Sequence, residues 1–485
     1  MIVILVGGGL VSQGQETLSL SNAIEKALKF NLGLAIDRQS PIQAREDLEI
    51  SRAGFDPVLQ VSGSAQESRQ AAAASELDGS ETPVSRGQDG QVSVSKKFSS
   101  GANVSLDGQA DRSDTDSSYA KLNPAFSTDA GVAIQQPLLK GGGRDVNLLG
   151  VRLGEIAVSK ADLGLRSKVL NLLRDVEKAY WDAAYALASQ DVCVAAKKQA
   201  ADLVKETEAR NKAGLATTLD VVQAQAEEAA KQESVINADQ TVLNTSDRLL
   251  ILLGRLNEHD RSPAISGDLA SAPVPPAEPL EQALAAARNN QPDYLSQAES
   301  IRARRYELDA ARRNQWPSLD LSGRASYAGQ SDTLNSAADS MLARDGYRWQ
   351  IGLEYKSPWG FREERARLQK SYLGLAQEHL RMDQLDQDLI LQMRTAYRAL
   401  STAQESLVAA GLTRDLRGRQ AAMERARYSA GTATLRDTLT AQNEFESARL
   451  RELKARLDHI AAVLELGRME GSLLARHGLN WAKIE

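Results

Sequence analysis

This sequence has little cysteine and histidine and no excess of positive charge, and each of these features argues against a class of function. The single cysteine, Cys193, allows no intrachain disulfide and no thiolate metal site, and its helical surroundings predict a buried, inert thiol. The four histidines are scattered without metal-ligand spacing, at His259, His379, His459 and His477. A net charge of −6, with both signs mixed throughout, argues against a nucleic-acid partner.

Nucleophile motifs such as G-x-S-x-G are missing as well. We therefore expect no catalysis and no cofactor. Aromatic residues make up only 5% of the 485 residues, which is low for a compact globule of this length. The high alanine content instead favours long helices that pack through small side chains.

Long hydrophobic runs are lacking too. The apolar segment Met1–Leu10 is too short to span a bilayer as a helix. Together with the small residues Ser12 and Gly14 it makes residues 1–14 resemble a secretory signal peptide, although the usual positive start is missing. Since no other stretch qualifies as a transmembrane helix, a membrane role would have to use a β-barrel.

What the chain does contain is a repeated bend. Residues Ala209–Gln225 return as Ala426–Gln442, 217 positions later and without a gap. Gly214 and Gly431 suit the left-handed position that ends a helix, and the Thr-x-x-Asp that follows has the spacing of a helix-starting cap. Each copy therefore predicts a sharp turn between two long helices, with the caps at Thr217 and Asp220 and at Thr434 and Asp437.

The two bends belong to two halves that follow the same plan. In each half, helical patterns precede alternating, strand-like segments, which lead into a long helix, the bend and a return helix. The halves are residues 15–270 and 280–474, with a proline-rich linker at 271–279 and a tail at 475–485. Strand-like alternation covers 57–65, 92–106, 129–137, 318–327 and 348–356, and the polar segments 66–90, 111–127 and 328–346 predict loops.

Each half offers too few strands for a sizeable sheet. A sheet with open edges cannot lie in lipid, because its unpaired backbone groups would find no hydrogen-bond partner there. A membrane role would therefore require several copies of the chain to close one barrel. The first half also holds an extra hairpin around Val92–Leu106, which either lies outside the membrane or alters the barrel.

These features together resemble the TolC family of outer-membrane efflux proteins. The resemblance rests on the duplicated plan, the two tips and the strand-to-helix joints QPLLKGG (Gln136–Gly142) and SPWG (Ser357–Gly360). It implies a mainly α protein with membrane β-structure. In that fold a trimeric outer-membrane β-barrel of four strands per chain continues into a long periplasmic α-helical barrel, with two structural repeats in each chain.

The resemblance also implies a function and partners. It implies a passive exit duct in the outer membrane of a Gram-negative-type cell, with the helical part in the periplasm. The duct would be a homotrimer that contacts outer-membrane lipid, a periplasmic adaptor (membrane fusion protein) and an inner-membrane transporter. It would serve efflux or type I secretion and export small molecules or proteins.

Functional residues follow from the resemblance position by position. Asp437 falls on an aspartate of the periplasmic entrance, and Tyr428 and Asp220 fall on positions that link neighbouring helices when the entrance is closed. Where some members have a linking arginine two residues after the tip glycine, this chain has Ala433, and nearby Arg436 is a candidate substitute. An adaptor would dock on the hairpin tips, at Gly214, Leu215, Gly431 and Thr432.

Two alternatives stand beside this interpretation. By spacing alone, Asp220 and Asp437 are helix-starting carboxylates that stabilise their helices by about 0.3–1 kcal/mol, a role that is compatible with an entrance role. For the whole chain, the rival function is a periplasmic coiled-coil adaptor or scaffold without a channel. Such a protein should have one hairpin flanked by compact β-domains rather than two hairpins and duplicated strands.

Overall fold

The structure is a computed structural model that describes residues 17–69, 82, 84–116, 120–256, 264–267, 269, 279–479 and 481. The predicted signal peptide at 1–14 and residues 271–278 of the predicted linker lie outside the described residues. Part of the predicted tail, residues 480 and 482–485, also lies outside them. Among the described residues, no helix is both long and apolar enough to cross a membrane.

The chain folds into two compact units, and each takes segments from both sequence halves. One unit comprises Met1–Ser40, Asp162–Ser296 and Asp383–Glu485, and the other comprises Pro41–Ala161 and Gln297–Met382. The helices are α1 (Leu20–Phe30), α2 (Leu32–Asp37), α3 (Gln39–Ala53), α5 (Arg144–Asn147), α6 (Leu149–Lys212), α7 (Thr218–Leu252), α8 (Leu280–Asn290), α9 (Pro292–Asn314), α10 (Leu334–Leu342), α11 (Arg362–Ser429), α12 (Leu435–Glu470) and α13 (Leu473–Arg476).

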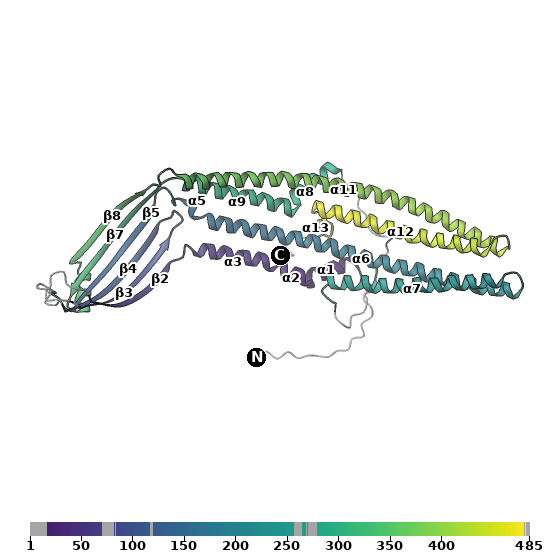
Figure 1. The fold of residues 1–485 in the computed structure, drawn as a ribbon, viewed down its shortest axis with the longest axis horizontal. Helices are drawn as coiled ribbons and strands as arrows, with labels where there is room; N and C mark the ends of the chain where they lie inside the picture. The colour runs from purple at the N-terminus through teal and green to yellow at the C-terminus, as the bar shows by residue number, and fades with distance from the viewer. Residues whose placement is uncertain are drawn as a thin grey trace, which may run out of the picture. The chain divides into compact units, whose positions relative to one another are not determined.

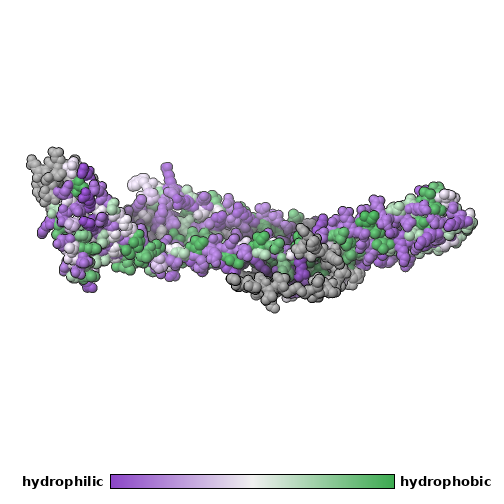
Figure 2. All heavy atoms as spheres, turned by 90° about the horizontal axis from the view of Figure 1, so that it is seen from below, coloured by the Kyte–Doolittle hydropathy of each residue, from purple (hydrophilic) through white to green (hydrophobic). Residues whose placement is uncertain are grey.

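The larger parts of two long helical hairpins, α6–α7 and α11–α12, make up most of the first unit (Figure 1). Its largest core cluster gathers α1, α6, α7 and α12 around fully buried side chains such as Val169, Leu173 and Leu249. A second cluster packs α8 against α11 and α12 around Ala283, Ala287 and Met393. On the face seen in Figure 2, hydrophilic residues cover most of the helical surface, and hydrophobic ones form small, separate patches. Most buried side chains of the two clusters are aliphatic, and Tyr180 and Trp181 are the aromatic ones among them, in keeping with the low aromatic content.

The second unit contains a six-stranded antiparallel sheet in the order β2-β3-β4-β5-β7-β8 (Figure 1). Its strands are longer than the sequence predicts, so the loop predictions at 66–90 and 111–127 are wrong at their ends, and the loop prediction at 328–346 misses α10. The bounds are β2 (Val58–Arg69), β3 (Val84–Lys97), β4 (Asn103–Thr115), β5 (Ala125–Pro137), β7 (Ser318–Ser331) and β8 (Gly346–Lys356), while β1 (Thr17–Leu18) and β6 (Ala264–Ile265) pair in parallel in the first unit.

The extra hairpin found in the sequence is part of this sheet. Its strands β3 and β4 lie between β2 and β5, so the chain contributes six strands to one sheet, whereas the resemblance implied four. The pattern of alternation could not place the hairpin, because it shows which side chains share a face and not which strand lies alongside.

Helix α10 lies against one end of the sheet. The Thr128 hydroxyl on β5 donates to the Ala337 carbonyl oxygen of α10 at 3.0 Å. A Cβ built on Gly329 of β7 would lie 2.0 Å from that same carbonyl oxygen. Glycine at this position therefore lets the helix approach the strand closely.

Candidate functional site: the ends of the two helical hairpins

Both hairpin tips have the conformation that the repeat predicts. Gly214 and Gly431 have φ values of 75° and 77°, in the left-handed region. At the first tip the Gly214 and Leu215 N–H groups donate to the carbonyl oxygens of Asn211 and Arg210, at 2.9 and 2.8 Å. The second tip repeats the pattern on Tyr428 and Arg427, so each helix ends in the bond pattern typical of a glycine-terminated helix.

The two tip aspartates form capping boxes at the starts of α7 and α12. The Asp220 carboxylate accepts from the Thr217 N–H at 2.8 Å, and the Thr217 hydroxyl in turn accepts from the Asp220 N–H at 3.1 Å. Thr434 and Asp437 repeat this exchange at 3.3 and 3.2 Å. The capping prediction is therefore confirmed at both tips, while the entrance role of Asp437 and the helix-linking role of Asp220 stay predictions.

The surroundings of Asp437 also lower the pKa of its carboxyl group. Hydrogen bonds from the Thr434 hydroxyl and backbone, with smaller contributions from the charges of Arg427 and Arg436, hold the pKa of Asp437 below its ordinary value. A carboxyl whose pKa is lowered by folding contributes its stabilisation above the unfolded pKa and loses it as the pH falls. Asp437 is therefore ionised at neutral pH, exposed at the tip, and close enough to Arg436 to feel its charge.

Behind the tips, the two hairpins share a small core. It is built from Leu203, Val204, Ala224, Tyr428 and Leu435, which come from α6, α7, α11 and α12. Tyr428 is 5% exposed, and its hydroxyl lies 3.3 Å from the Thr207 hydroxyl, which is fully buried. Thr207 also donates to the Leu203 carbonyl at 2.8 Å, so in the Tyr428 contact it acts as the acceptor.

An arginine that the sequence left without a role joins the hairpins at the same point. The Arg210 guanidinium lies over the Tyr428 ring, 4.5 Å from its centroid, and donates to the Ser429 carbonyl at 2.7 Å. Its repeat partner Arg427 instead donates to the Thr432 carbonyl of its own tip, at 3.4 Å. The signal for Arg210 was its recurrence in the repeat, but recurrence could not show that only the first copy crosses to the other hairpin.

Removing the Tyr428 hydroxyl separates the hydrogen bond from the packing. Tyr428→Phe should lower the free energy of unfolding by only about 0.5–1.5 kcal/mol, because Thr207 keeps its bond to Leu203 and the ring keeps its place under Arg210. Tyr428→Ala should cost about 3–5 kcal/mol, since it also empties the buried ring site. Thermal unfolding of the two purified variants measures the difference. Equal losses would mean that the hydroxyl contact dominates.

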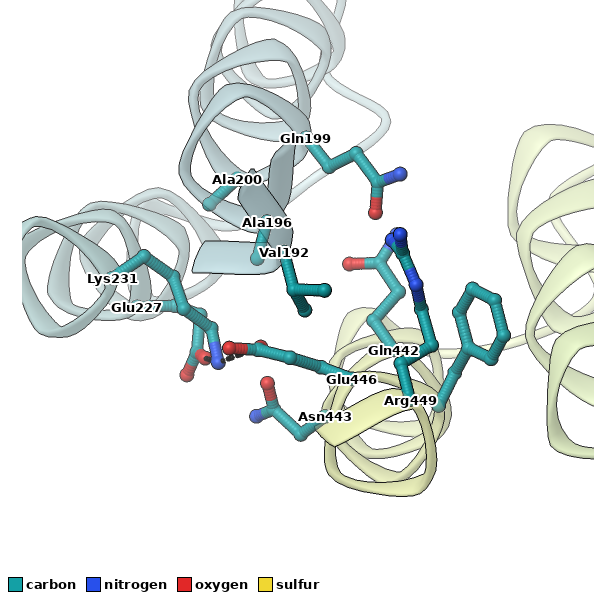
Figure 3. Close-up of a pocket in the computed structure, with 11 residues that line it drawn as sticks. Val192, Ala196, Gln199, Ala200, Glu227, Lys231, Gln442, Asn443, Glu446 and Arg449 are labelled. Atoms are coloured by element: carbon teal, nitrogen blue, oxygen red, sulfur yellow. Dashed lines mark hydrogen bonds and ion pairs between the residues drawn. The ribbon is translucent and has the colours of Figure 1, made fainter. Parts of the chain in front are cut away.

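A second link between the hairpins involves three charged groups (Figure 3). Lys231 on α7 lies 2.6 Å from Glu446 on α12 and 3.3 Å from Glu227 on its own helix. Their side chains are only 16%, 13% and 22% exposed. We call this trio the Lys231 latch. It lines a small cleft together with Val192 on α6 and other residues.

Burial lowers the pKa of Lys231, but the hydrogen bonds and charges of Glu446 and Glu227 outweigh this and raise the pKa above its ordinary value. The lysine is therefore charged throughout the physiological range. Cys193 is buried, as the sequence predicts, and burial followed by the charge of Glu446 raises the pKa of its thiol. Such a thiol has little thiolate character and is chemically inert.

The site brings together some of the predicted residues and leaves others apart. Tyr428 contacts Thr207 and Arg210 of the other hairpin, whereas Asp220 is bonded to Thr217 beside it. Arg436 is exposed on the first turn of α12. The residues predicted to dock an adaptor lie exposed at the two tips, and Leu215 is 76% exposed although apolar. Among the described residues, no group of acidic, histidine or cysteine side chains could hold a metal ion.

Comparisons with solved structures show the fold. The chain is similar to the outer-membrane channel OprN, with 18% identity, a TM-score of 0.68 and coverage of 93% of this chain and 90% of that one. It is similar to the Campylobacter jejuni CmeC outer membrane channel, with 16% identity, a TM-score of 0.67 and coverage of 97% and 94%. It is also similar to the open state of the Neisseria gonorrhoeae MtrE outer membrane channel, with 18% identity, a TM-score of 0.63 and coverage of 94% of this chain and 89% of that one.

Sequence comparison identifies the family. No curated protein sequence matches the chain. The profile of the family described as outer membrane efflux protein matches residues 23–255 and 283–472, two segments that follow the two halves of the repeat. With most of its length matched in this way and a TolC-like fold, the chain is a member of the outer membrane efflux protein family.

Proposed function

We propose that this protein is a passive outer-membrane exit duct, either in a tripartite efflux pump or in a type I secretion system. Three copies would form the duct. Its sheets would contact outer-membrane lipid, and its helices would lie in the periplasm. The hairpin tips would meet a periplasmic adaptor coupled to an inner-membrane transporter, which would deliver small molecules or proteins to the duct.

The observation that carries this proposal is the division of the sheet into two faces. The cross-strand register aligns apolar residues on one face of all six strands, and most of the larger ones are at least 37% exposed. The opposite face carries serine, glutamine and charged residues. A sheet that separates lipid from water requires this arrangement. The apolar face includes Leu59, Val61, Val92, Val94, Leu106, Val132, Ile134, Leu321, Tyr327, Tyr347, Trp349, Ile351, Leu353 and Tyr355.

The same features favour the duct over the adaptor or scaffold. An adaptor should have a single hairpin between compact β-domains, whereas this chain has two hairpins and one sheet with an exposed apolar face. Leu215 and Thr432 then present the exposed tips to the adaptor, and the contacts of Tyr428 and Arg210 hold the hairpins together in the closed entrance. Asp437 lies at an exposed tip, where three copies would form an acidic ring.

Conductance of the purified protein in a planar bilayer tests the proposal. A duct should give stable, discrete channels that multivalent cations block from one side, because a ring of carboxylates concentrates cations at its own end. Failure to insert into membranes, or a protein that stays soluble without detergent, would contradict the duct and favour the scaffold.

The acidic ring has its own test within that measurement. Asp437→Asn should weaken the cation block by about tenfold, corresponding to about 1.4 kcal/mol, and should leave trimer assembly intact. Asparagine keeps a side-chain oxygen for the cap, so this variant removes charge with little change to the helix start. Asp220→Asn makes the same change at the other tip and shows whether the block depends on Asp437 in particular. An unchanged block in Asp437→Asn would leave Asp437 with its capping role alone.

A further inference from the structure

The β3–β4 hairpin is hydrogen-bonded into the sheet on both sides. Every residue of β2, Val58–Arg69, has a partner on β3. On the other side, Asn103–Ser113 of β4 pair with Ala125–Gln135 of β5. A hairpin that stood away from the membrane wall would leave β2 and β5 to pair directly with each other, and here two full strands separate them.

The hairpin also shares the two faces of its neighbours. The register places Val94 and Leu106 in one row with Leu59 on β2 and Val132 on β5. All four side chains are between 38% and 65% exposed on the apolar face. A hairpin in water would have no physical reason to continue this row, because large apolar side chains at those positions would face solvent.

An ion cluster on the polar face joins the hairpin to the second half of the chain. Arg324 on β7 donates to Asp107 on β4 at 2.9 Å and to Asp129 on β5 at 2.8 Å. The Asp107 side chain is only 8% exposed. Because β5 lies between β4 and β7, this cluster spans three strands and ties the hairpin to the strand order observed.

The stagger of the strands matches that of a closed barrel. Following the pairings from Val58 at the start of β2 across the sheet leads to Gln350, six residues before the end of β8 at Lys356. With Val58 and Lys356 placed at the same height along the barrel axis, a stagger of six residues at about 3.3 Å over five strand spacings of about 4.8 Å corresponds to a strand tilt of roughly 40°. This tilt is within the range of about 35–45° for barrels.

The outermost strands can join one copy of the chain to the next. Among the described residues, β2 and β8 each pair with one neighbour only, so each leaves one backbone edge unpaired within the chain. With six antiparallel strands in order, β2 and β8 run in opposite directions, so β8 of one copy can pair antiparallel with β2 of the next.

We infer that three copies close a barrel of 18 strands through these edges, rather than the 12 that four strands per chain would provide. The inference rests on the proposed duct function. At the same strand spacing and tilt, the backbone diameter rises from about 24 Å to about 36 Å. Barrels of this strand number leave an aqueous channel, so the exit for cargo is wide.

Cysteine pairs test the strand order in the membrane-inserted trimer, with Cys193 replaced by serine. Ser105→Cys with Ala133→Cys should form a disulfide within one chain, because these residues are direct partners on β4 and β5. Ser64→Cys with Ser127→Cys should not, since β2 and β5 are three spacings, about 14 Å, apart and a disulfide needs less than about 7 Å. Ser62→Cys with Glu354→Cys or Gly352→Cys should form a disulfide between different copies. When the same stagger per strand is extended from β8 of one copy to β2 of the next, these positions become neighbours on the polar face.

Counting strands in an electron-microscopy map of the unmodified trimer in lipid nanodiscs provides a second readout that no substitution can disturb. Eighteen strands would support the inference. Twelve strands would overturn it while leaving the duct intact. So would a disulfide in the Ser64→Cys/Ser127→Cys variant together with none in the Ser105→Cys/Ala133→Cys variant. A protein that forms no membrane-inserted trimer would overturn the proposed function and the inference together.

Discussion

Lys231→Met is expected to destabilise the paired hairpins more than any other single loss of charge discussed for this protein. The change would leave the Glu446 and Glu227 carboxylates facing each other, both largely buried and without their cation. Breaking a buried ion pair by removing one partner costs about 3–5 kcal/mol, because the remaining charge is uncompensated. Thermal unfolding followed by helical circular dichroism measures the loss.

Lys205→Met is the matched control. Lys205 pairs with Asp202 at 3.8 Å on α6, but its side chain is 79% exposed, so this change should fall within about 0.5 kcal/mol of the unmodified protein. In the proposed duct, Lys231→Met should also raise the open fraction of channels, since the Lys231 latch joins α7 to α12. Equal stability of the two lysine variants would show that the latch carries no net stabilisation.

The pH dependence of the latch follows from the raised pKa of Lys231. A lysine whose pKa is raised by folding contributes its full stabilisation below the unfolded value of about 10.4 and loses it only as the pH rises through the folded value. Lysine deprotonation should therefore not weaken the latch between about pH 6 and about pH 9. A difference in melting temperature between the unmodified protein and Lys231→Met that shrinks within this window would contradict the assignment.

Gly254→Ala is the second change with a large expected effect. Gly254 follows α7 with φ of 66°, and a Cβ there would lie 2.0 Å from the Phe30 carbonyl oxygen at the end of α1. The Asn31 side chain donates to the Leu252 carbonyl at 2.9 Å, so the end of α7 is held against the α1–α2 junction. The strain of an alanine in the left-handed region and the separation of α7 from α1 that its Cβ forces should together lower the free energy of unfolding by about 2–5 kcal/mol.

Substitutions at two other glycines separate the effect of backbone strain from that of the contact with Phe30. Gly214→Ala has the same backbone strain, with φ of 75°, but nothing within 4 Å of the added carbon, so it should cost about 1–2 kcal/mol. Gly411→Ala within α11 also meets open space and should stabilise by roughly 0.5–1 kcal/mol. Equal melting temperatures for Gly254→Ala and Gly214→Ala would contradict the close contact with Phe30.

The features that the sequence predicted well are local ones. The caps at Thr217 and Thr434, the left-handed glycines and the long helices each depend on residues within a few positions of one another, so spacing alone specifies them. The strand faces were predictable for the same reason, because alternation is a property of each strand by itself. Strand ends were missed where polar residues continue the strands, as at the end of β2.

The functional residues divide in the same way. Tip positions such as Leu215 and Asp437 could be found because the repeat and the family resemblance mark them. Arg210, Thr207 and Lys231 could not be assigned, because their partners Ser429, Tyr428 and Glu446 are more than 200 residues away in the chain. Nothing in a residue's own neighbourhood records which distant helix packs against it.

By itself, then, the sequence determined the duplicated plan, the two capped bends and the amphipathic strands, since these arise from local conformational preference and from the periodicity of apolar residues. Only the tertiary structure decided that β3 and β4 lie between β2 and β5, and that Lys231 and Arg210 join the two hairpins. The physical reason is that the pairing of strands and of buried charges depends on neighbours brought together by the whole fold, and one strand's alternation is compatible with several such neighbours.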